Sequence, residues 1–391
     1  MFELLPHWGK DGKGVIKMLY KMLKAFANAT IFTGNEMITG KAVIVRDERV
    51  ADIVDAGQIP RDAEQIDCHG INLAPGLIDI QIAGGGGYLF SAHPTPEALE
   101  AMTSSLIQSG TTGFLISVPT DTSEVYHDVI NTVKNNPHPA VIGLHLEGPY
   151  ISTHRRGAHM KNLIRCPEVN DIRRLITDSG GVIKMITVAP EVCTQEVIEY
   201  LNDNGIVVAA GHSNATFREG VQGFKWGIRT TTHLFNAMSQ LHHRDPGLPG
   251  AAFLTEGAHA SIIADGIHVD YNVVKIAKKL MDDRLFLISD AVEENFKGPY
   301  QHVRKEDRFA LPDGTLSGSK LSVLKAVGNC VRYVGITIEE AIRMGSAYPA
   351  EVLGINDRGY IKPGFRADLT GFDDEFNVKL VCIGGEIIQL I

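Results

Sequence analysis

Three residues far apart in the chain have the side-chain types and sequence contexts of ligands for a catalytic metal ion. Glu147 lies in the segment GLHLEGPY, His212 in AAGHSNAT and His233 in TTHLFNAM. Each of them lies at or near the end of a short apolar run. A catalytic zinc ion is usually held by three protein ligands, with the fourth position open for water. One carboxylate and two imidazoles in these contexts therefore predict a metal-dependent hydrolase.

Eight apolar segments recur through the middle of the chain, separated by amphipathic, helix-like segments. Continuous apolar runs of this length are typical of strands that are buried on both faces, as in a parallel sheet. Eight strand–helix alternations favour a TIM-like (β/α)8 barrel. A doubly wound open sheet is the structural alternative, but no nucleotide-binding fingerprint supports it. The expected strands cover residues 72–82, 112–119, 141–148, 183–190, 205–212, 229–235, 260–267 and 285–291.

Polar side chains fall at or just after the carboxyl ends of these expected strands. In a (β/α)8 barrel the active site is built at that rim from the ends of several strands. The segment that follows the last strand looks too polar for a core and is long enough to form a flap over the site. The polar residues at the expected rim are Gln81, Glu147, His212, His233, Asp265, His268 and Asp290.

The two ends of the chain have a different pattern from the middle. Residues 22–72 and 358–391 alternate polar and apolar residues between turn signals, so we expect short strands that form one small β-sandwich domain. The catalytic barrel would then span residues 73–357. Residues 1–21 are basic and glycine-rich and lack the apolar core of a signal peptide, so we expect a poorly ordered extension there.

The composition narrows the class of protein. A formal net charge of -9 argues against a general binder of nucleic acid or anionic membranes, because such proteins present a basic surface. No apolar run approaches the roughly 20 residues of a membrane-spanning helix. The five cysteines are scattered without a CxxC pair, which indicates neither a disulfide framework nor a structural zinc site and favours a reducing cytoplasm.

Several longer motifs resemble those of one protein family. They are PGLIDIQ at the first expected strand, then HLEGP, AGHSNA, THLFNAM and ADGIHVD, and KPGFRADL near the C-terminus. Together they resemble the amidohydrolase superfamily and, within it, the N-acetylglucosamine-6-phosphate deacetylases, over residues 27–391. The resemblance implies hydrolysis of the acetamide of N-acetyl-D-glucosamine 6-phosphate, which gives glucosamine 6-phosphate and acetate.

The same resemblance implies roles for individual residues. Glu147, His212 and His233 match the family's metal ligands. Asp290, in the segment ISDA, matches the catalytic acid and base, and His159, in RRGAH, matches a histidine near the substrate carbonyl. Asp290 would take a proton from the attacking water and return it to the leaving amine. His159 would donate a hydrogen bond to the oxyanion that forms on the carbonyl.

The resemblance also implies how the sugar phosphate is held. In the family, an arginine that contacts the phosphate reaches across a dimer interface, so the match at Arg244 implies a homodimer. The implied partner is a small amino-sugar phosphate, with no nucleic acid and no membrane. The residues placed at the substrate are Gln81, Asn236, the backbone of Ala237, Arg244 and His268.

The first expected strand departs from a common amidohydrolase pattern. Many members carry an HxH pair at its end, which holds a second metal ion. The matching positions here are Gln81 and Ala83, and neither has an imidazole. We therefore expect one divalent ion per subunit. Zinc is the expected ion, although iron, manganese or cobalt can use the same nitrogen and oxygen ligands.

Simpler explanations compete with these assignments. A single buried histidine is more often hydrogen-bonded in a core than bound to a metal. Asp290 could be a helix N-cap, and His159 and Arg244 lie in polar loops. Asp265 either orients His268 or caps a turn. Two other functions also compete: another class of amidohydrolase, such as a cyclic-amide hydrolase or deaminase, and a non-catalytic barrel that serves as a scaffold and contains no metal.

Overall fold

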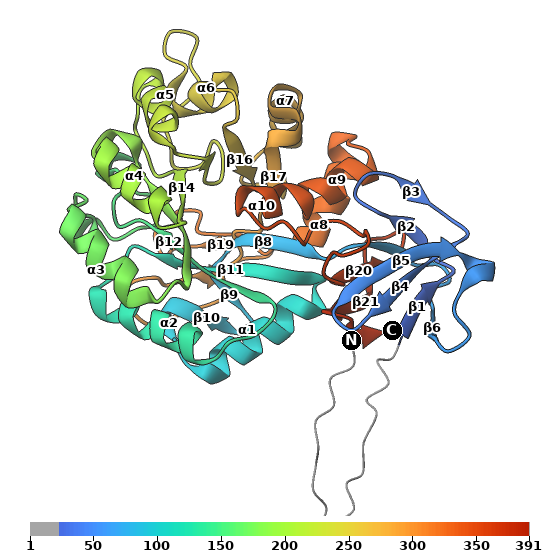
Figure 1. Cartoon of the computed structure of the whole chain (residues 1–391). Coiled ribbons are helices and arrows are strands. Elements are labelled where there is room, and N and C mark those ends of the chain that lie inside the picture. The colour runs from blue at the N-terminus through green and yellow to red at the C-terminus, as the bar shows by residue number, and fades with distance from the viewer. Residues whose placement is uncertain (1–22, 391) are drawn as a thin grey trace, which may run out of the picture.

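The computed structural model describes residues 23–390, so the extension expected at residues 1–21 lies outside the described residues. Figure 1 shows two parts side by side. One is a barrel of strands surrounded by helices. The other is a smaller, β-rich part in which the first and the last described strands both lie.

The barrel contains eight strands in the order β17-β16-β15-β14-β13-β12-β11-β8, and each neighbouring pair is parallel. It closes where Ile82 forms a parallel bridge with Ala291. Most residues of these strands are buried, as their continuous apolar runs predict. The strands are β8 (Leu77–Ile82), β11 (Thr111–Pro119), β12 (Val141–Glu147), β13 (Ile183–Val188), β14 (Val207–Ala210), β15 (Thr230–Thr231), β16 (His259–Ile262) and β17 (Leu285–Leu287).

Helices cover the outside of the barrel (Figure 1). Five of them begin at a threonine whose hydroxyl accepts a backbone N–H of the first turn, and such a cap is worth about 1 kcal/mol. Their apolar faces pack on the strands in one continuous core. The helices are α1 (Pro96–Gln108), α2 (Ser123–Asn135), α3 (Val169–Ser179), α4 (Gln195–Asp203), α5 (Phe217–Trp226), α6 (Gly247–Leu254), α7 (Tyr271–Met281), α8 (Val323–Asn329), α9 (Ile338–Met344) and α10 (Ala347–Val352).

The smaller part contains two sheets, ordered β5-β4-β1-β6 and β22-β21-β20-β7-β2-β3. β20 pairs with β7, so strands from both ends of the chain share a sheet, and Phe26, Leu73 and Leu380 lie in a core that draws on both sheets. The strands are β1 (Leu23–Ala27), β2 (Thr30–Phe32), β3 (Met37–Ile38), β4 (Lys41–Arg46), β5 (Arg49–Asp55), β6 (Glu64–Asp67), β7 (Asn72–Pro75), β20 (Leu369–Phe372), β21 (Val378–Ile383) and β22 (Glu386–Leu390).

These two parts confirm the expected fold class, a (β/α)8 barrel with a small β-sandwich built from both chain ends. The proposed division at residues 72 and 358 stays a prediction. β7 begins at Asn72 and pairs with β20, so the first barrel strand, β8, begins within two residues of the end of a sandwich strand.

The segment after β17 was expected to be too polar for a core, but part of it is buried. It carries two short strands, β18 (Val303–Arg304) and β19 (Phe309–Ala310), which pair antiparallel. Val292, Tyr300 and Phe309 are buried and pack with Leu89, which lies in the hairpin of β9 (Gly84–Gly85) and β10 (Tyr88–Leu89). We call residues 292–318 the flap. Its inner face is therefore apolar core, and the expectation that this segment is too polar for a core was wrong.

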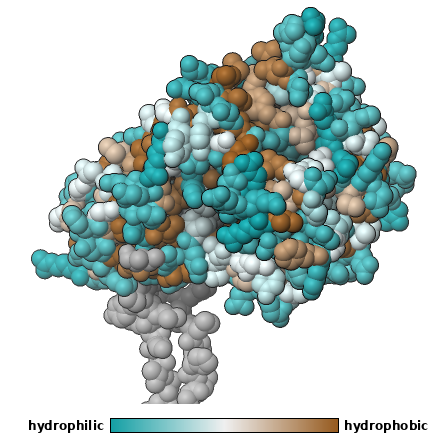
Figure 2. Space-filling model, turned by 180° about the vertical axis from the view of Figure 1, so that it is seen from behind, coloured by the Kyte–Doolittle hydropathy of each residue, from teal (hydrophilic) through white to brown (hydrophobic). Residues whose placement is uncertain are grey.

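Large apolar side chains are exposed on two neighbouring helices. Leu254 at the end of α6 is 74% exposed, and Ile276 and Leu280 of α7 are 52% and 50% exposed. We call these three residues the α6–α7 patch. Hydrophobic surface is visible in the upper part of the face shown in Figure 2. Among residues 23–390, no helix combines the length and the apolar character needed to cross a membrane.

Candidate active site

The three expected metal ligands come together at the carboxyl ends of neighbouring strands. Glu147 is the last residue of β12, while His212 and His233 each lie two residues beyond the ends of β14 and β15. The Oε1 atom of Glu147 lies 2.9 Å from Nε2 of His212 and 2.9 Å from Nε2 of His233. The two Nε2 atoms are 3.1 Å apart. All three residues are buried.

The backbone around this cluster is held in an uncommon conformation. Non-glycine residues rarely adopt positive φ, and each such residue costs on the order of 1–3 kcal/mol. His212 (φ 45°), His233 (φ 34°), Ala237 (φ 48°) and Asp290 (φ 50°) all have it. Strain of this kind persists where the surrounding structure enforces it, and it concentrates at functional sites. Four of the expected site residues therefore share a backbone feature that a strand or helix pattern does not reveal.

The hydrogen bonds of His212 leave one ring nitrogen free for a metal ion. Its Nδ1 atom lies 3.2 Å from the carbonyl oxygen of Arg155, which can only accept, so Nδ1 carries the proton. Nε2 then has a lone pair, and it faces Glu147. Burial lowers the pKa of His212 to about 4, so the ring is neutral near pH 7. A neutral imidazole whose other nitrogen donates to a carbonyl is the usual arrangement of a metal-ligating histidine.

Glu147 and His233 complete a donor set that fits one divalent ion. Burial opposes ionisation of Glu147, but the surrounding histidines, with His212 first, hold the pKa of its carboxyl well below the usual range. Burial would lower the pKa of His233, but its hydrogen bond and charge attraction to Glu147 raise it. Its Nδ1 atom has no hydrogen-bond partner among the described residues. One carboxylate oxygen and two imidazole nitrogens converge on one point, which is a ligand set that zinc accepts.

His159 also lies within reach of this point but presents a different atom. Donor atoms of Glu147, His159 and His212 all lie within 4.8 Å of one another, which would also allow His159 as a ligand. However, Nδ1 of His159 lies 3.1 Å from the backbone N–H of Thr120 and must accept from it. The proton of the neutral ring is therefore on Nε2, 3.7 Å from Oε2 of Glu147. A protonated nitrogen has no lone pair for a metal, so His159 fits the part of a hydrogen-bond donor.

Asp290 and Gln81 lie on the other side of Glu147. The Gln81 amide donates from Nε2 to Oδ1 of Asp290 at 3.0 Å and to Oε1 of Glu147 at 3.2 Å. Burial, and then the negative charge of Glu147, raise the pKa of Asp290 to about 7. A carboxyl group with its pKa near neutrality suits a group that accepts and returns a proton. The helix that follows, α8, is capped by Ser322, so the alternative that Asp290 is a helix N-cap was wrong.

The expected substrate contacts are placed unevenly. The His268 side chain is 5% exposed, and its Nδ1 atom lies 2.6 Å from Oδ2 of Asp265. The other carboxylate oxygen of Asp265, Oδ1, accepts the backbone N–H of His268, so Asp265 both orients the ring and caps the turn. Asn236 is half-buried and its backbone N–H donates to the carbonyl of His233. The carbonyl of Ala237 accepts from Ser213. These residues lie on the loops beside the metal ligands, and their roles stay predictions.

Arg244 lies apart from the cluster within this chain. It sits in the turn between His242 and Asp245, which bond to each other through their backbones, and its side chain is exposed. Its guanidinium group has no hydrogen bond or ion pair with residues 23–390. The turn immediately precedes α6, whose last residue, Leu254, belongs to the α6–α7 patch.

The position expected for a second metal ligand is occupied by an apolar contact. Ala83 packs against the cluster of Leu89, Val292, Tyr300 and Phe309. The amide of Gln81, two residues earlier, already donates to both carboxylates. Gln81 was expected at the substrate, and the structure shows that its amide nitrogen is engaged within the protein. Within the described chain, these two positions thus supply no imidazole, in agreement with one ion per subunit.

Sequence comparison identifies the family. The amidohydrolase family matches residues 72–388, and a domain described as the NagA composite domain matches residues 24–73. The chain belongs to the amidohydrolase family. It is 32% identical to the N-acetylglucosamine-6-phosphate deacetylase of Haemophilus influenzae over 93% of this chain and 99% of that protein. It is also 32% identical to the human protein of the same name, over 91% of this chain and 90% of that one.

Solved structures agree with this family. The N-acetylglucosamine-6-phosphate deacetylase of Pasteurella multocida superposes with a TM-score of 0.91 at 32% identity, covering 94% of this chain and all of that one. A mutant of the Mycobacterium smegmatis enzyme in complex with N-acetyl-D-glucosamine-6-phosphate superposes with a TM-score of 0.87 at 26% identity, over 94% of this chain and 99% of that one. The amidohydrolase fold is therefore complete over the described residues.

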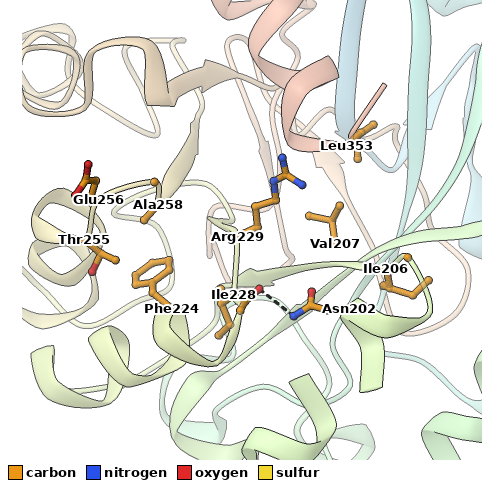
Figure 3. A pocket seen from close by; sticks show the side chains of 13 residues that line it. Asn202, Ile206, Val207, Phe224, Ile228, Arg229, Thr255, Glu256, Ala258 and Leu353 are labelled. Carbon is orange, nitrogen blue, oxygen red and sulfur yellow. Dashed lines mark hydrogen bonds between the residues drawn. The ribbon is translucent and has the colours of Figure 1, made fainter. Parts of the chain in front are cut away.

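A cavity of this amidohydrolase lies at the end of the barrel opposite to the candidate active site. It has a volume of about 500 Å³, and Figure 3 shows Arg229, Glu256 and Asn202 among the side chains that line it. Val207, Arg229 and Ala258 lie at the amino ends of β14, β15 and β16. In (β/α)8 barrels the catalytic rim is the carboxyl end of the strands, and residues at the amino end serve stability. None of the expected catalytic residues lines this cavity.

Proposed function

We propose that this amidohydrolase removes the acetyl group from N-acetyl-D-glucosamine 6-phosphate, producing glucosamine 6-phosphate and acetate. The observation that carries the proposal is the convergence of Glu147, His212 and His233 next to Asp290 and the Nε2–H of His159. Relatives that match nearly the whole chain act on this substrate according to their names. The arrangement supplies both the ligands and the proton acceptor that amide hydrolysis needs.

Glu147, His212 and His233 would hold one divalent ion. Such an ion lowers the pKa of water toward neutrality and polarises a carbonyl group. The ionised carboxylate of Glu147 and the neutral ring of His212 suit this purpose. We propose zinc as the ion, since a site of one carboxylate and two imidazoles is typical of catalytic zinc, although iron, manganese and cobalt accept the same donors.

Asp290 and His159 would carry the proton and the developing charge. Asp290 accepts a proton from the attacking water and delivers it to the departing nitrogen, which one carboxyl group with a pKa near 7 can do in both directions. His159 donates its Nε2 proton to the oxygen that becomes negative as the carbonyl is attacked. Gln81 holds Asp290 in place through its amide. The acetyl group therefore lies between His159 and Asp290 in this proposal.

The sugar phosphate would be bound by the loops around this centre. We propose that His268, Asn236 and the backbone of Ala237 contact it from the same subunit. Arg244 would contact the phosphate of the partner subunit's substrate, because its guanidinium group has no partner among residues 23–390. Its turn also leads into α6, the helix whose last residue is Leu254 of the α6–α7 patch. Exposed apolar patches rimmed by polar residues often mark interfaces between subunits. A homodimer in which the α6–α7 patch is covered would account both for the exposed apolar side chains and for the unpartnered Arg244 side chain.

The cysteines favour the cytoplasm as the compartment. All five are free thiols, and four of them are buried. Burial raises the pKa of the Cys330 and Cys382 thiols to about 12, so they behave as inert apolar side chains. A fold that uses its cysteines in this way gains nothing from an oxidising environment, and we propose a reducing one.

The direct test is acetate release from N-acetylglucosamine 6-phosphate and from unphosphorylated N-acetylglucosamine. Each substrate is given to the zinc-loaded enzyme and to enzyme stripped by a chelator. We expect turnover of the phosphorylated sugar, loss of turnover on chelation and recovery when zinc is restored. A protein that contains metal but releases acetate from neither sugar contradicts the substrate. A protein that purifies and remains free of metal contradicts the metal centre and favours the scaffold alternative.

A further inference from the structure

Thr120 occupies a central place in the site although no catalytic motif includes it. It follows directly after β11 and is fully buried. Its three polar groups each bond a different part of the site. The backbone N–H donates to Nδ1 of His159 at 3.1 Å, the hydroxyl donates to the carbonyl of Glu147 at 3.1 Å, and the carbonyl accepts from the hydroxyl of Tyr300.

The bond from Thr120 decides which nitrogen of His159 carries a proton. A backbone N–H can only donate, so Nδ1 of His159 must present a lone pair to it. The other nitrogen, Nε2, then carries the proton and points toward Glu147. The ring is 3% exposed, so water does not supply an alternative partner for Nδ1. In the opposite tautomer, the N–H groups of Thr120 and Nδ1 would face each other, and Nε2 would have no proton to donate.

Tyr300 brings the flap into the same arrangement. Its hydroxyl is buried and burial raises the pKa of that hydroxyl, so it stays protonated and donates to the Thr120 carbonyl. Its ring meets the ring of His159 edge-on, with centroids 6.3 Å apart. The flap in turn holds Tyr300 through Asn295, whose side-chain amide donates to the Tyr300 carbonyl at 2.6 Å. The flap thus contacts His159 both through the ring and through Thr120.

The loop after Glu147 is built around the same threonine. Gly148 has φ of 87°, and a Cβ atom at this position would come within 2.2 Å of the Thr120 hydroxyl oxygen. A side chain there would therefore displace Thr120, which explains why glycine follows Glu147 directly. Thr120 is held from the Glu147 strand on one side and from the flap on the other, which fixes the direction of its N–H.

We propose that Thr120 and Tyr300 are positioning residues that hold His159 as the Nε2–H tautomer, so that only an ordered flap gives His159 a proton to donate. This inference rests on the proposed function, because it assigns His159 to the carbonyl oxygen. It makes the flap part of the catalytic arrangement: loss of the Tyr300 hydroxyl releases one side of Thr120 and weakens the preference for this tautomer.

The test is the Tyr300→Phe variant, which keeps the ring beside His159 and removes only the hydroxyl. The zinc-loaded enzyme is labelled with 15N-histidine, and the His159 signals are identified by their loss in His159→Gln. In the wild type we expect Nδ1 without a proton and Nε2 with one. In Tyr300→Phe we expect a mixture of tautomers and a kcat reduced roughly tenfold or more, as small misplacements of catalytic groups produce. KM and zinc content should change less than about twofold, because neither the ligands nor the sugar contacts are altered.

A matched control is Tyr348→Phe. Tyr348 is also buried, and its hydroxyl bonds Glu340 and Arg343 on the outside of the barrel. Its variant should lose stability but keep the His159 signals and kcat of the wild type. A proton on Nδ1 of His159 in the wild-type enzyme contradicts the inference, whether or not the variant folds. Unchanged tautomer and kcat in a folded Tyr300→Phe also contradict it. Failure of the proposed function appears differently, as a wild-type enzyme that releases no acetate from the sugar phosphate while the tautomer is still measurable.

Discussion

Gln81 and Asp290, which are 209 positions apart, are joined twice. The backbone N–H of Asp290 donates to the Gln81 carbonyl at 2.9 Å, and the Gln81 side-chain amide donates to Oδ1 of Asp290 at 3.0 Å. The first bond helps to close the barrel between β8 and the end of β17. The second holds the carboxylate that we propose as the proton acceptor. The position at which many amidohydrolases carry a metal-binding histidine here donates a hydrogen bond to the proposed catalytic base.

The Gln81→Leu variant should shift the pH dependence of the reaction. In the proposed mechanism Asp290 works as a carboxylate, so activity should fall as the pH drops through the pKa of Asp290. The Gln81 hydrogen bond lowers that pKa against the effects of burial and Glu147. A hydrogen bond to a charged group is worth about 1.5–3 kcal/mol. Its loss should therefore move the acid limb of kcat/KM about one to two units toward higher pH, since one unit corresponds to about 1.4 kcal/mol.

The control for this variant is Gln195→Leu. The Gln195 amide donates to Glu199 on the exposed face of α4 at 2.7 Å, so the same chemical change is made away from the site. Both variants should be compared with the wild type as zinc enzymes, because a bound cation lowers the pKa of Asp290 in all of them. An acid limb that stays in the same place in Gln81→Leu is evidence against Asp290 as the group that titrates.

Asp290→Asn should retain the metal and lose turnover. The amide keeps the size of the side chain but cannot accept and return a proton, and general acid–base catalysis contributes about 10²–10⁴-fold to a rate. Acetate release should fall by this factor, while zinc content measured by elemental analysis stays at one ion per subunit. Asp270→Asn is the matched control, because Asp270 caps α7 through an oxygen that asparagine also has. Substantial turnover by Asp290→Asn excludes the proposed role.

Metal content should separate the ligands from His159. His212→Gln and His233→Gln each remove a lone pair from the cluster, and zinc affinity should fall by more than the roughly 10–100-fold that loss of an outer partner costs. His159→Gln should bind zinc like the wild type and lose kcat, because its Nε2 carries a proton. Competition with a zinc-responsive chelating dye measures all three. Loss of zinc from His159→Gln, with retention in His233→Gln, indicates that His159 is the third ligand.

The free energy of unfolding should depend on pH because of the buried carboxyl group of Asp79. This residue is buried in β8, and burial raises the pKa of its carboxyl to about 6, although it accepts backbone N–H groups of Ser289 and Gln81. Its folded pKa lies above the unfolded value of 3.8, so it favours folding below about pH 4, and that contribution is lost as the pH rises to about 6. The expected loss is about 3 kcal/mol, from about two units at 1.4 kcal/mol each.

Asp79→Asn should lack this pH dependence. Urea unfolding of the metal-free wild type and variant measures the free energy of unfolding at pH 4.5 and at pH 7. The first pH is about 0.7 unit above the unfolded pKa of Asp79, and the second is about one unit above its folded pKa. The variant should gain stability relative to the wild type as the pH rises between these values. Asp52→Asn, on the exposed side of β5, is the control and should follow the wild type. A constant difference between Asp79→Asn and the wild type contradicts a raised pKa.

The features that the sequence predicted are those that depend on residue type and period. The continuous apolar runs are buried in the parallel strands, and each run ends at the carboxyl rim of the barrel. The sequence alone therefore predicted that Glu147, His212 and His233 lie together. The ends of the chain alternate in polarity and form a sandwich with two covered sheets. Which residues are buried and how the chain connects its strands determine the barrel and the sandwich alike. The type and spacing of the residues in the sequence indicate both properties.

The features that the sequence did not predict depend on how backbone groups and loops are oriented in the folded chain. Which nitrogen of His159 carries a proton follows from a backbone N–H of Thr120, and backbone groups are the same in every residue. The positive φ of His212 and Asp290 is enforced by loops that pack after the strands end. The polar flap buries Tyr300 and Phe309 because the hairpin after β8 offers them an apolar partner, Leu89. Of these features, only the presence of Thr120 in the site could have been inferred from the sequence, because Thr120 directly follows an expected strand.

Arg244 offers the last test, because its proposed role crosses between subunits. Arg244→Ala should raise KM for N-acetylglucosamine 6-phosphate about 10–100-fold, the range expected when a hydrogen bond to a charged group is lost. The control is Arg46→Ala, which removes an exposed arginine at the end of β4 and should leave KM unchanged.

Co-expression of Arg244→Ala with Asp290→Asn then shows which subunit's site Arg244 serves. Each mixed dimer has one site with an intact Asp290 that receives Arg244 from its partner, so about a quarter of the wild-type activity should return at low substrate. If Arg244 serves its own subunit, mixed dimers contain no complete site and activity does not return.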